Sequence, residues 1–337
     1  MRFLSQLKNK NLTEKVYLLR VDYNVENIKD ALRLQASLPT IKFLLNKNAT
    51  VVILSHRGRP QGKEPALSLK FVLPFLKKNL KEKLVFLKEI PKKLPKGKLF
   101  LLENLRFWPN EEANDAVFAE KLAQLGDFYV NDAFAVSHRE NTSITQLPKL
   151  LPSYAGFLLE KEIQTLSKAM SHPAKPLLVI FGGAKVKNKI AAIKNLSKKA
   201  NKILLGSSVT TKIPALKSLP AAKIIKPVDW IAENGKTFDI GPLTAQKYTE
   251  EIKKARTIIW NGPVGWFENK KFAGGSIAIA KAIAASKAFS IIGGGETTQL
   301  ILQLKLQNKI SFLSTGGGAM LEFLAGKKLP GIEVLKI

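Results

Sequence analysis

Cysteine is absent from this chain of 337 residues. Its absence excludes disulfides, thiolate metal sites and a cysteine nucleophile, and it suits a reducing compartment. Long hydrophobic runs are also absent, and the N-terminal stretch MRFLSQLKNKNLTEK lacks the apolar core of a secretory signal. We therefore expect a cytoplasmic protein that does not enter a membrane.

Acidic residues are scarce: 26 stand against 54 lysines and arginines, which gives a net charge of +28. Such a charge attracts nucleic acid or anionic metabolites. However, 46 of the positive residues are lysines, scattered along the chain without interleaved arginine and aromatic residues. This pattern is typical of a solvated surface, so we expect nucleic-acid binding to be non-specific if it occurs at all.

Arginine is rarer still, with eight residues, and there are only three histidines. Because lysine supplies bare positive charge elsewhere, the arginines indicate positions that need a planar, two-pronged donor. Seven of them precede residue 140: Arg2, Arg20, Arg33, Arg57, Arg59, Arg106 and Arg139. Glycine has the opposite bias, with 17 of 22 residues after position 170. The first half thus carries donors for an anion, and the second half carries flexible backbone turns.

Short apolar runs alternate with helical patterns along the whole chain, and both the length and the 45% hydrophobic content favour two globular domains. The expected strands cover 16–25, 50–57, 83–87, 98–104 and 127–134 in the first half, and 176–183, 201–208, 222–228, 256–262, 287–295 and 311–318 in the second. Near-continuous apolar strands separated by helices indicate parallel sheets covered on both faces. We predict an α/β protein with two doubly wound parallel-sheet lobes, bridged by an amphipathic helix over 156–170.

Polar motifs fall at the C-terminal ends of these strands: VDYN, SHRGR, ENLR and NDAF in the first half, and FGGAK, WNGP, GGGET and STGGG in the second. In open α/β sheets this edge is where ligands bind. The first edge offers Asp, Asn, His and Arg, whereas the second offers Gly, Lys, Thr and Glu. The sequence therefore predicts two ligand half-sites.

Three glycine clusters, at 181–185, 291–298 and 313–320, follow strands in the second half. Each alone fits a tight strand-to-helix turn equally well, but three together with Lys185 and Lys189 favour a polyphosphate ligand. Neither GxGxxG nor GxxxxGK[ST] is present, which argues against a nicotinamide dehydrogenase and a Walker-type ATPase. Glu296 is either a Mg²⁺ ligand or an ordinary acid at a helix start, and Glu268 either a ribose ligand or a solvated loop acid.

In their order, the motifs RVDYNV, SHRGRP, ENLRF, GGAKVKNKI, DIGP, WNGPVGWFE, IIGGGETT and STGGGAMLEFLAGKKLPGI resemble the phosphoglycerate kinase family over almost the entire chain. The resemblance implies two Rossmann-like lobes: 1–153 for 3-phosphoglycerate and 171–319 for the nucleotide. It also implies an interdomain helix over 154–170, a tail over about 320–337 that packs on the first lobe, and a monomer. The implied activity is glycolytic: reversible phosphoryl transfer between 1,3-bisphosphoglycerate and Mg-ADP, giving 3-phosphoglycerate and Mg-ATP, with closure of the lobes.

Residue by residue, the resemblance assigns roles to both lobes. The 3-phosphoglycerate residues are Asp22, Asn24, Arg33, His56, Arg59, Arg106 and Arg139. The nucleotide residues are Gly183, Lys185, Lys189, Asn261, Pro263, Glu268, Gly293, Gly294, Gly295, Glu296 and Thr297. Glu296 is expected to hold Mg²⁺ through the nucleotide, and Arg33 and Lys185 are predicted to act catalytically on the moving phosphoryl group. Arg57 matches no family position and is interpreted as a surface residue.

The second half departs from the family pattern. Asn188 and Glu296 stand where the family has Asp, the chain is shorter after GSSVTTKI, and Trp266 replaces a small aliphatic residue. A second hypothesis is therefore a catalytically weak relative that binds 3-phosphoglycerate and has a scaffolding or nucleic-acid role. The retained lysines and the GGGET and STGGG motifs argue against it.

Overall fold

The computed structural model describes residues 1–28, 32–183, 186–211 and 223–336. Contacts divide the chain into two compact units: Met1–Ile163 with Lys328–Ile337, and Gln164–Lys327. The first unit thus extends past residue 153 into helix α5 (Phe157–Ser171), and the returning tail begins at Lys328. Among the described residues, no helix is both long enough and apolar enough to cross a bilayer.

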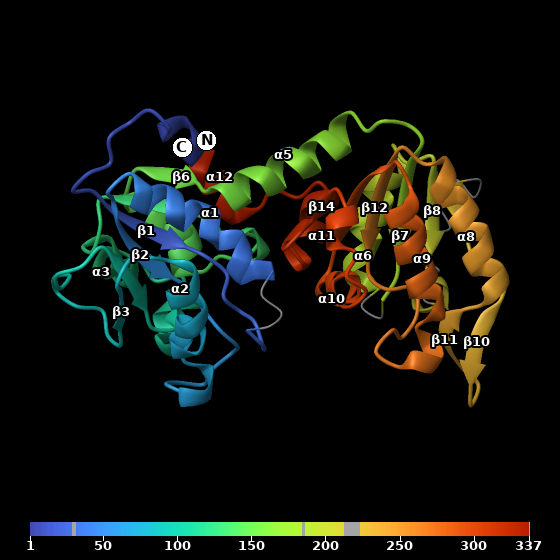
Figure 1. Cartoon of the computed structure of the whole chain (residues 1–337), viewed down its shortest axis with the longest axis horizontal. Coiled ribbons are helices and arrows are strands. Elements are labelled where there is room, and N and C mark those ends of the chain that lie inside the picture. Colours follow the sequence, from blue (N-terminus) through green and yellow to red (C-terminus); the bar gives the residue numbers. More distant parts are fainter. Residues whose placement is uncertain (29–31, 184–185, 212–222, 337) are drawn as a thin grey trace. The chain divides into compact units, whose positions relative to one another are not determined.

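The first unit contains a parallel sheet of six strands within the described residues, in the order β3-β4-β2-β1-β5-β6 (Figure 1). The strands are β1 Val16–Arg20, β2 Thr50–Leu54, β3 Leu84–Leu87, β4 Leu99–Leu102, β5 Phe128–Asn131 and β6 Ser153–Ala155. All four residues of β4 are buried, and in β1 and β2 only the first residue is partly exposed. Burial on both faces explains why these strands read as continuous apolar runs.

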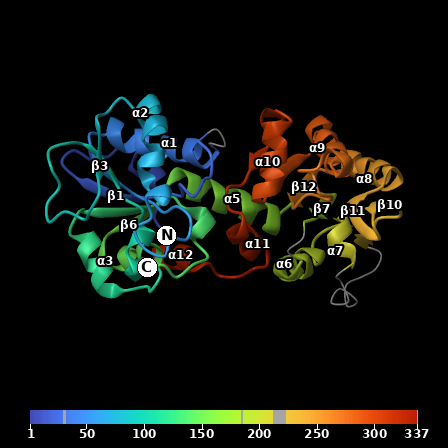
Figure 2. The same cartoon turned by 90° about the horizontal axis from the view of Figure 1, so that it is seen from below.

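Helices cover both faces of this sheet. In Figure 2, α1 (Leu32–Asn46) and α2 (Leu73–Asn79) lie on one face, and α3 (Ala116–Ala123) and α12 (Pro330–Glu333) lie on the other. The short helix α4 (Leu147–Leu150) adjoins α3. Asp115 caps the start of helix α3: its carboxylate accepts a hydrogen bond from the Phe118 amide at 2.6 Å.

Both ends of the chain lie beside β6 (Figures 1 and 2). Phe3 forms an isolated parallel bridge with Ala155. On the C-terminal side, the Gly331 amide donates to the Ser137 carbonyl at 2.9 Å, and Asn131 Nδ2 donates to the Gly331 carbonyl at 3.0 Å. A Cβ at position 331 would lie only 2.6 Å from Ile144 Cγ2, so glycine permits this close approach. The tail is therefore part of the first unit's core.

The second unit contains another parallel sheet, in the order β14-β13-β12-β7-β8-β9. Its strands are β7 Leu177–Phe181, β8 Lys202–Leu205, β9 Ile224–Ile225, β12 Thr257–Asn261, β13 Phe289–Gly293 and β14 Phe312–Leu313. Its helices are α6 Lys187–Ser197, α7 Ser207–Thr211, α8 Pro242–Lys254, α9 Gly274–Ala285, α10 Gly295–Gln303 and α11 Gly318–Leu324. Helices α8, α9 and α10 lie on one face, with α6, α7 and α11 on the other (Figure 2). The predicted doubly wound fold class is confirmed for each unit.

An antiparallel hairpin, β10 (Trp230–Glu233) with β11 (Lys236–Ile240), adds to the second unit and was not predicted. Its turn places Asn234 and Gly235 at φ of 49° and 73°. Two positive φ values at adjacent turn residues are the signature of a type I′ hairpin, for which Asn-Gly is the preferred pair. The stretch WIAENGKTFDI therefore carried a readable hairpin signal.

Asp132, at the C-terminal end of β5, is fully buried and caps helix α5. Its Oδ1 accepts hydrogen bonds from the amides of Leu158 and Leu159 at 2.8 and 3.1 Å. Burial raises the pKa of this carboxyl to about 7, although the two helix amides and the nearby Thr40 hydroxyl favour the charged form. Desolvation thus outweighs the attraction of the helix N-terminus for a negative charge.

The raised pKa of Asp132 predicts a pH-dependent stability. An unfolded Asp loses its proton near pH 4, so between pH 4 and 7 the folded state binds the extra proton and stability falls as the pH rises. Asp132→Asn mimics the protonated carboxyl and removes this dependence. We expect the difference in unfolding free energy between the variant and the parent protein to change by about 2 kcal/mol in favour of the variant as the pH rises from 5 to 8. Urea denaturation at each pH measures this difference. A difference that stays constant across this range would contradict the assignment.

Candidate active site

The first unit brings its predicted polar residues to one edge of the sheet. Asp22 follows β1, His56 follows β2, Arg106 lies in the short 3-10 helix η4 (Leu105–Phe107) after β4, and Arg139 follows β5. Since these strands are parallel and neighbours in the sheet, their C-terminal ends lie side by side. The edge therefore gathers one histidine and several guanidinium groups in a small region.

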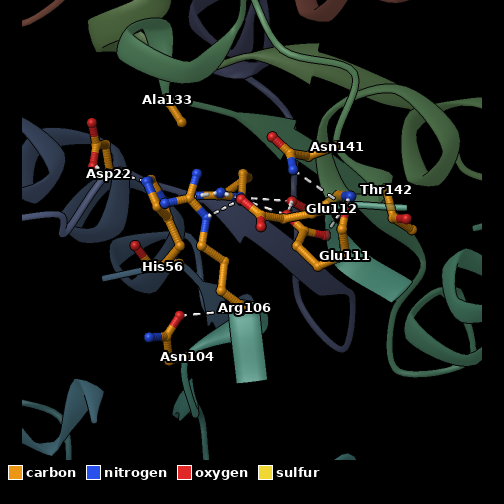
Figure 3. Close-up of polar contacts among 12 residues, drawn as sticks. Asp22, His56, Asn104, Arg106, Glu111, Glu112, Ala133, Asn141 and Thr142 are labelled. Atoms are coloured by element: carbon orange, nitrogen blue, oxygen red, sulfur yellow. Dashed lines mark hydrogen bonds and ion pairs between the residues drawn. The ribbon is translucent and has the colours of Figure 1, made fainter. Parts of the chain in front are cut away.

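His56 is buried and electrically neutral at pH 7. Its pKa lies well below 6.5 because burial disfavours the charged ring and because Arg20, Arg106, Arg33 and Arg139 repel it. Arg20 Nη2 lies 3.1 Å from His56 Nδ1. A guanidinium can only donate, so Nδ1 accepts and the ring proton resides on Nε2. That N–H faces Asp22, whose Oδ1 is 3.9 Å from Nε2 (Figure 3).

Asp22 organises the neighbouring groups at the edge. Its Oδ2 lies 3.1 Å from Arg33 Nη1, and its Oδ1 accepts from the Asn24 amide at 2.9 Å. Arg33 also donates to the Asn24 carbonyl at 2.9 Å, while its side chain keeps 27% of its surface exposed. Two anchors on Nη1 hold the guanidinium in place and leave part of it accessible. Arg33 can therefore meet a bound anion without first being ordered.

Arg106 is held from two sides in the same region. Its Nε lies 3.2 Å from Glu112 Oε1, and its Nη1 donates to the Gly58 carbonyl at 2.5 Å. Burial lowers its pKa to about 10, with Glu112 opposing the change, so the side chain stays charged at neutral pH. Figure 3 shows Arg106 beside His56, with Glu111 and Glu112 on its far side.

Sequence reasoning missed the buried support beneath this cluster. Arg20 is 1% exposed and donates to Ser143 Oγ at 2.8 Å and to the Val21 carbonyl at 2.5 Å, besides its contact with His56. Its Nη2 lies 3.8 Å from Glu111 Oε1, and Glu111 accepts from the Ser143 amide and hydroxyl. Burial raises the pKa of Glu111, and Arg20 is the strongest opposing influence. An arginine within an apolar strand was the only available signal.

The remaining residues that were predicted to bind 3-phosphoglycerate in the first unit differ in how closely they contact the groups around His56. Asn24 Oδ1 accepts from the Gly58 amide at 2.9 Å, so the side chain fixes the loop that carries His56. Arg139 is half-buried and close enough to repel charge on His56 and Arg106. Arg59 is exposed and makes no side-chain hydrogen bond or ion pair with any described residue. The structure therefore clusters these predicted residues apart from Arg59.

In the second unit, the loops after β7 and β12 pack backbone against backbone. The Gly183 amide donates to the Pro263 carbonyl at 2.7 Å, and the Gly182 amide donates to the Asn261 carbonyl at 3.1 Å. A Cβ on Gly182 would lie 2.0 Å from the Pro263 oxygen, and one on Gly262 would lie 2.2 Å from the Gly182 oxygen. These glycines are therefore required for the two loops to meet.

Charged groups converge where the loops meet. A Cβ on Gly183 would lie 3.5 Å from Lys189 Nζ and 3.6 Å from Glu296 Oε2, so the ammonium and the carboxylate flank this glycine. Glu296 is exposed in the first turn of α10. Asn261 is 2% exposed, and its Nδ2 has no hydrogen-bond partner within the described part of the chain. A buried amide donor without a partner is costly unless a ligand satisfies it.

The other nucleotide-side predictions have mixed surroundings. Thr297 is buried, and its hydroxyl accepts from the Gly262 amide at 2.8 Å, so it joins the start of α10 to the β12 loop. Glu268 is exposed, and Gly294 has a φ of 97°. Trp266 is 47% exposed and stacks on Phe272, with ring centroids 6.0 Å apart. Lys185 lies outside the described residues.

The sheet edges of the two units thus carry different groups: guanidinium groups around a neutral histidine in one, and glycine loops with a lysine in the other. Such a pairing in two α/β units is typical of a phosphotransferase. A family model described as "PGK: Phosphoglycerate kinase" matches residues 7–218 and 207–327. The chain belongs to the phosphoglycerate kinase family, and it is an enzyme.

Individual relatives agree with the family model. Phosphoglycerate kinases of Finegoldia magna and Pseudothermotoga lettingae are 38% and 40% identical to this chain, and the alignments cover 98% and 97% of both partners. Structures of phosphoglycerate kinases from Coxiella burnetii and Pyrococcus horikoshii match with TM-scores of 0.82 and 0.85, at 33% and 31% identity. The Coxiella match covers 97% of this chain and 97% of that chain, and the Pyrococcus match covers 100% of this chain and 98% of that chain. The Finegoldia alignment spans 387 positions, more than the 337 residues here, so this chain lacks segments present in that relative.

Proposed function

We propose that this chain transfers a phosphoryl group reversibly between the acyl phosphate of 1,3-bisphosphoglycerate and ADP, in glycolysis, and that 3-phosphoglycerate binds at the edge of the first unit's sheet. One observation carries the second part: Arg33, Arg106 and Arg139 gather around a neutral His56 whose Nε2–H is available as a donor. Arg59 completes the proposed set from an exposed position, and Asp22 and Asn24 hold the donors in place.

The nucleotide is proposed to bind at the edge of the second unit's sheet. Gly183, Gly293, Gly294 and Gly295 allow backbone amides to approach phosphate oxygens, and α10 starts at Gly295. Lys189, Lys185 and the amide of Asn261 are the proposed side-chain donors. Pro263, Glu268 and Thr297 complete the set that the family resemblance assigns.

Magnesium fits this edge as a partner of the nucleotide. Among the described residues there is no group of three or more acidic or histidine side chains that could hold a metal ion alone. The exposed Glu296 carboxylate, beside Lys189, is suited to an ion bound mainly through phosphate oxygens. When bound, the ion would offset negative charge on the phosphates.

The reaction requires no general base. The attacking oxygen of ADP is already anionic, the bond from phosphorus to the acyl oxygen breaks, and the carboxylate of 3-phosphoglycerate leaves with the electron pair. What limits the rate is repulsion between anions and the charge on the moving group, so positioning and electrostatic stabilisation supply the catalysis. We assign this role to Arg33 and Lys185. We also propose a cytoplasmic monomer, from the glycolytic reaction and the family resemblance.

A coupled assay tests this function. Purified protein is supplied with 3-phosphoglycerate, Mg²⁺ and ATP, with GTP in parallel and a mock purification as control. We expect ATP-dependent turnover, and the ratio of ATP to GTP rates will report which base the nucleotide site prefers. Binding of 3-phosphoglycerate without turnover on any nucleotide would instead support the weak-relative hypothesis, particularly if the protein also shifted bulk RNA in a salt-sensitive manner.

A further inference from the structure

A cavity of about 550 Å³ opens in the first unit, away from the predicted 3-phosphoglycerate residues, none of which lines it. Its volume lies within the usual range for small-molecule sites. We call it the Arg57 pocket; the lining residues that carry the argument are Arg57, Lys70, Phe71, Phe86, Lys88 and Phe107. Arg57 was interpreted as a surface residue; its side chain is partly exposed, and it is also hydrogen-bonded into the wall of this pocket.

Arg57 forms a preordered, flat part of the wall. Its Nε donates to the Val25 carbonyl at 3.1 Å, and its Nη1 donates to the Ala66 carbonyl at 2.7 Å. The guanidinium carbon lies 3.9 Å from the centroid of the Phe71 ring. Such stacking combines cation–π attraction with a fixed planar donor. Phe86, from β3, and Phe107, from η4, add two further aromatic side chains to the lining.

The positive charges of the pocket lack acidic partners. Among the described residues, Arg57, Lys70 and Lys88 form no ion pair. The two acids in the lining are already engaged. Glu89 pairs with Lys63, and the buried Glu103 accepts from the Leu69 and Asn104 amides and the Ser68 hydroxyl. With four cations and two carboxylates, the lining therefore carries a net positive charge beside aromatic surface.

Asn104 separates this pocket from the candidate active site. Its Oδ1 accepts from the Arg57 amide and from the Arg106 amide, both at 3.1 Å. The Arg106 side chain then extends to Glu112 and to the Gly58 carbonyl, whereas the Arg57 side chain turns toward Phe71. The two arginine side chains thus leave a shared support toward different partners, and of the two only Arg57 lines the pocket.

We propose that the Arg57 pocket binds a planar aromatic anion, with its ring against the phenylalanines and its phosphate or carboxylate near Arg57, Lys70 and Lys88. A simple anion would need only the surface lysines that this chain has in abundance, and an apolar ligand would leave the three cations unused. A nucleoside monophosphate and an aromatic acid share the required chemistry, so both are arms of the test.

The test is isothermal titration calorimetry of the full chain with 2-naphthyl phosphate. Saturating 3-phosphoglycerate and Mg-ADP are included, because this pair cannot react and occupies the proposed substrate and nucleotide sites. Cyclohexyl phosphate supplies the charge without the aromatic ring, and 2-naphthol supplies the ring without the charge. AMP tests the nucleotide as the source of the ligand, and 2-naphthoate tests the aromatic acid. We expect one site for 2-naphthyl phosphate, with a dissociation constant below about 1 mM, and binding at least about tenfold weaker for the first two analogues.

Matched variants locate the site. Lys88→Gln and Lys70→Gln change exposed residues, so folding should be unaffected, and each should weaken binding about fivefold. Arg57→Leu should weaken it more, and exposed Lys78→Gln, on α2 outside the pocket, should have no effect. Absence of binding, displacement by the substrate pair, equal binding of cyclohexyl phosphate, or indifference to all three pocket variants would each overturn the proposal. Because binding is measured without turnover, the result is independent of whether the kinase assay succeeds.

Discussion

Replacing Arg33 by methionine, or Lys185 by alanine, should lower kcat about a thousandfold while the fold is preserved. Arg33 lies at the candidate active site, 3.1 Å from Asp22, with 27% of its side chain still exposed. The proposed role of Arg33 and Lys185 is to stabilise negative charge on the phosphoryl group while it moves. Removing either cation should therefore raise the free-energy barrier to transfer more than it weakens substrate binding. The loss should therefore appear mainly in kcat, with KM for 3-phosphoglycerate changing much less.

The conservative variant makes this prediction sharper. Arg33→Lys retains a positive charge but loses the planar fork, so its rate should fall between those of the parent enzyme and Arg33→Met. Arg2→Met, which removes an exposed arginine on the first unit, is the matched control and should leave turnover unchanged. A rise in KM without a fall in kcat would mean that Arg33 only binds substrate.

The edge motifs were predictable from sequence because parallel strands deliver their C-terminal residues to a common edge. Asp22, His56 and Arg106 each end an apolar run, and strand order then brings them together. Three features belong to the tertiary structure instead. They are the contact between Arg20 and Glu111, 91 positions apart, the capping of α5 by Asp132, and the stacking of Arg57 on Phe71. Each depends on which side chains meet after folding, and no local pattern encodes this.

Replacing Arg20 by methionine should destabilise the protein by about 3 to 5 kcal/mol, the largest stability effect that we expect from a single buried side chain here. Arg20 and Glu111 are each 1% exposed, and their contact lies beneath His56. Without Arg20, the buried Glu111 loses its main counterion and keeps its hydrogen bonds from Ser143 and the weaker attraction of Arg106. Urea denaturation monitored by circular dichroism measures the loss, with Arg2→Met as an exposed control.

Two further measurements separate the loss of the charge pair from a simple loss of packing. The pKa of Glu111 is already raised by burial, and removing Arg20 raises it further, so folding will favour the protonated carboxyl. For an acid whose folded-state pKa is raised, stability falls as the pH rises through that pKa. The Arg20→Met deficit should therefore be smaller at pH 5 than at pH 8. Adding Glu111→Gln should recover about 2 kcal/mol at pH 8 because it removes the stranded charge, whereas a packing defect would remain unrelieved.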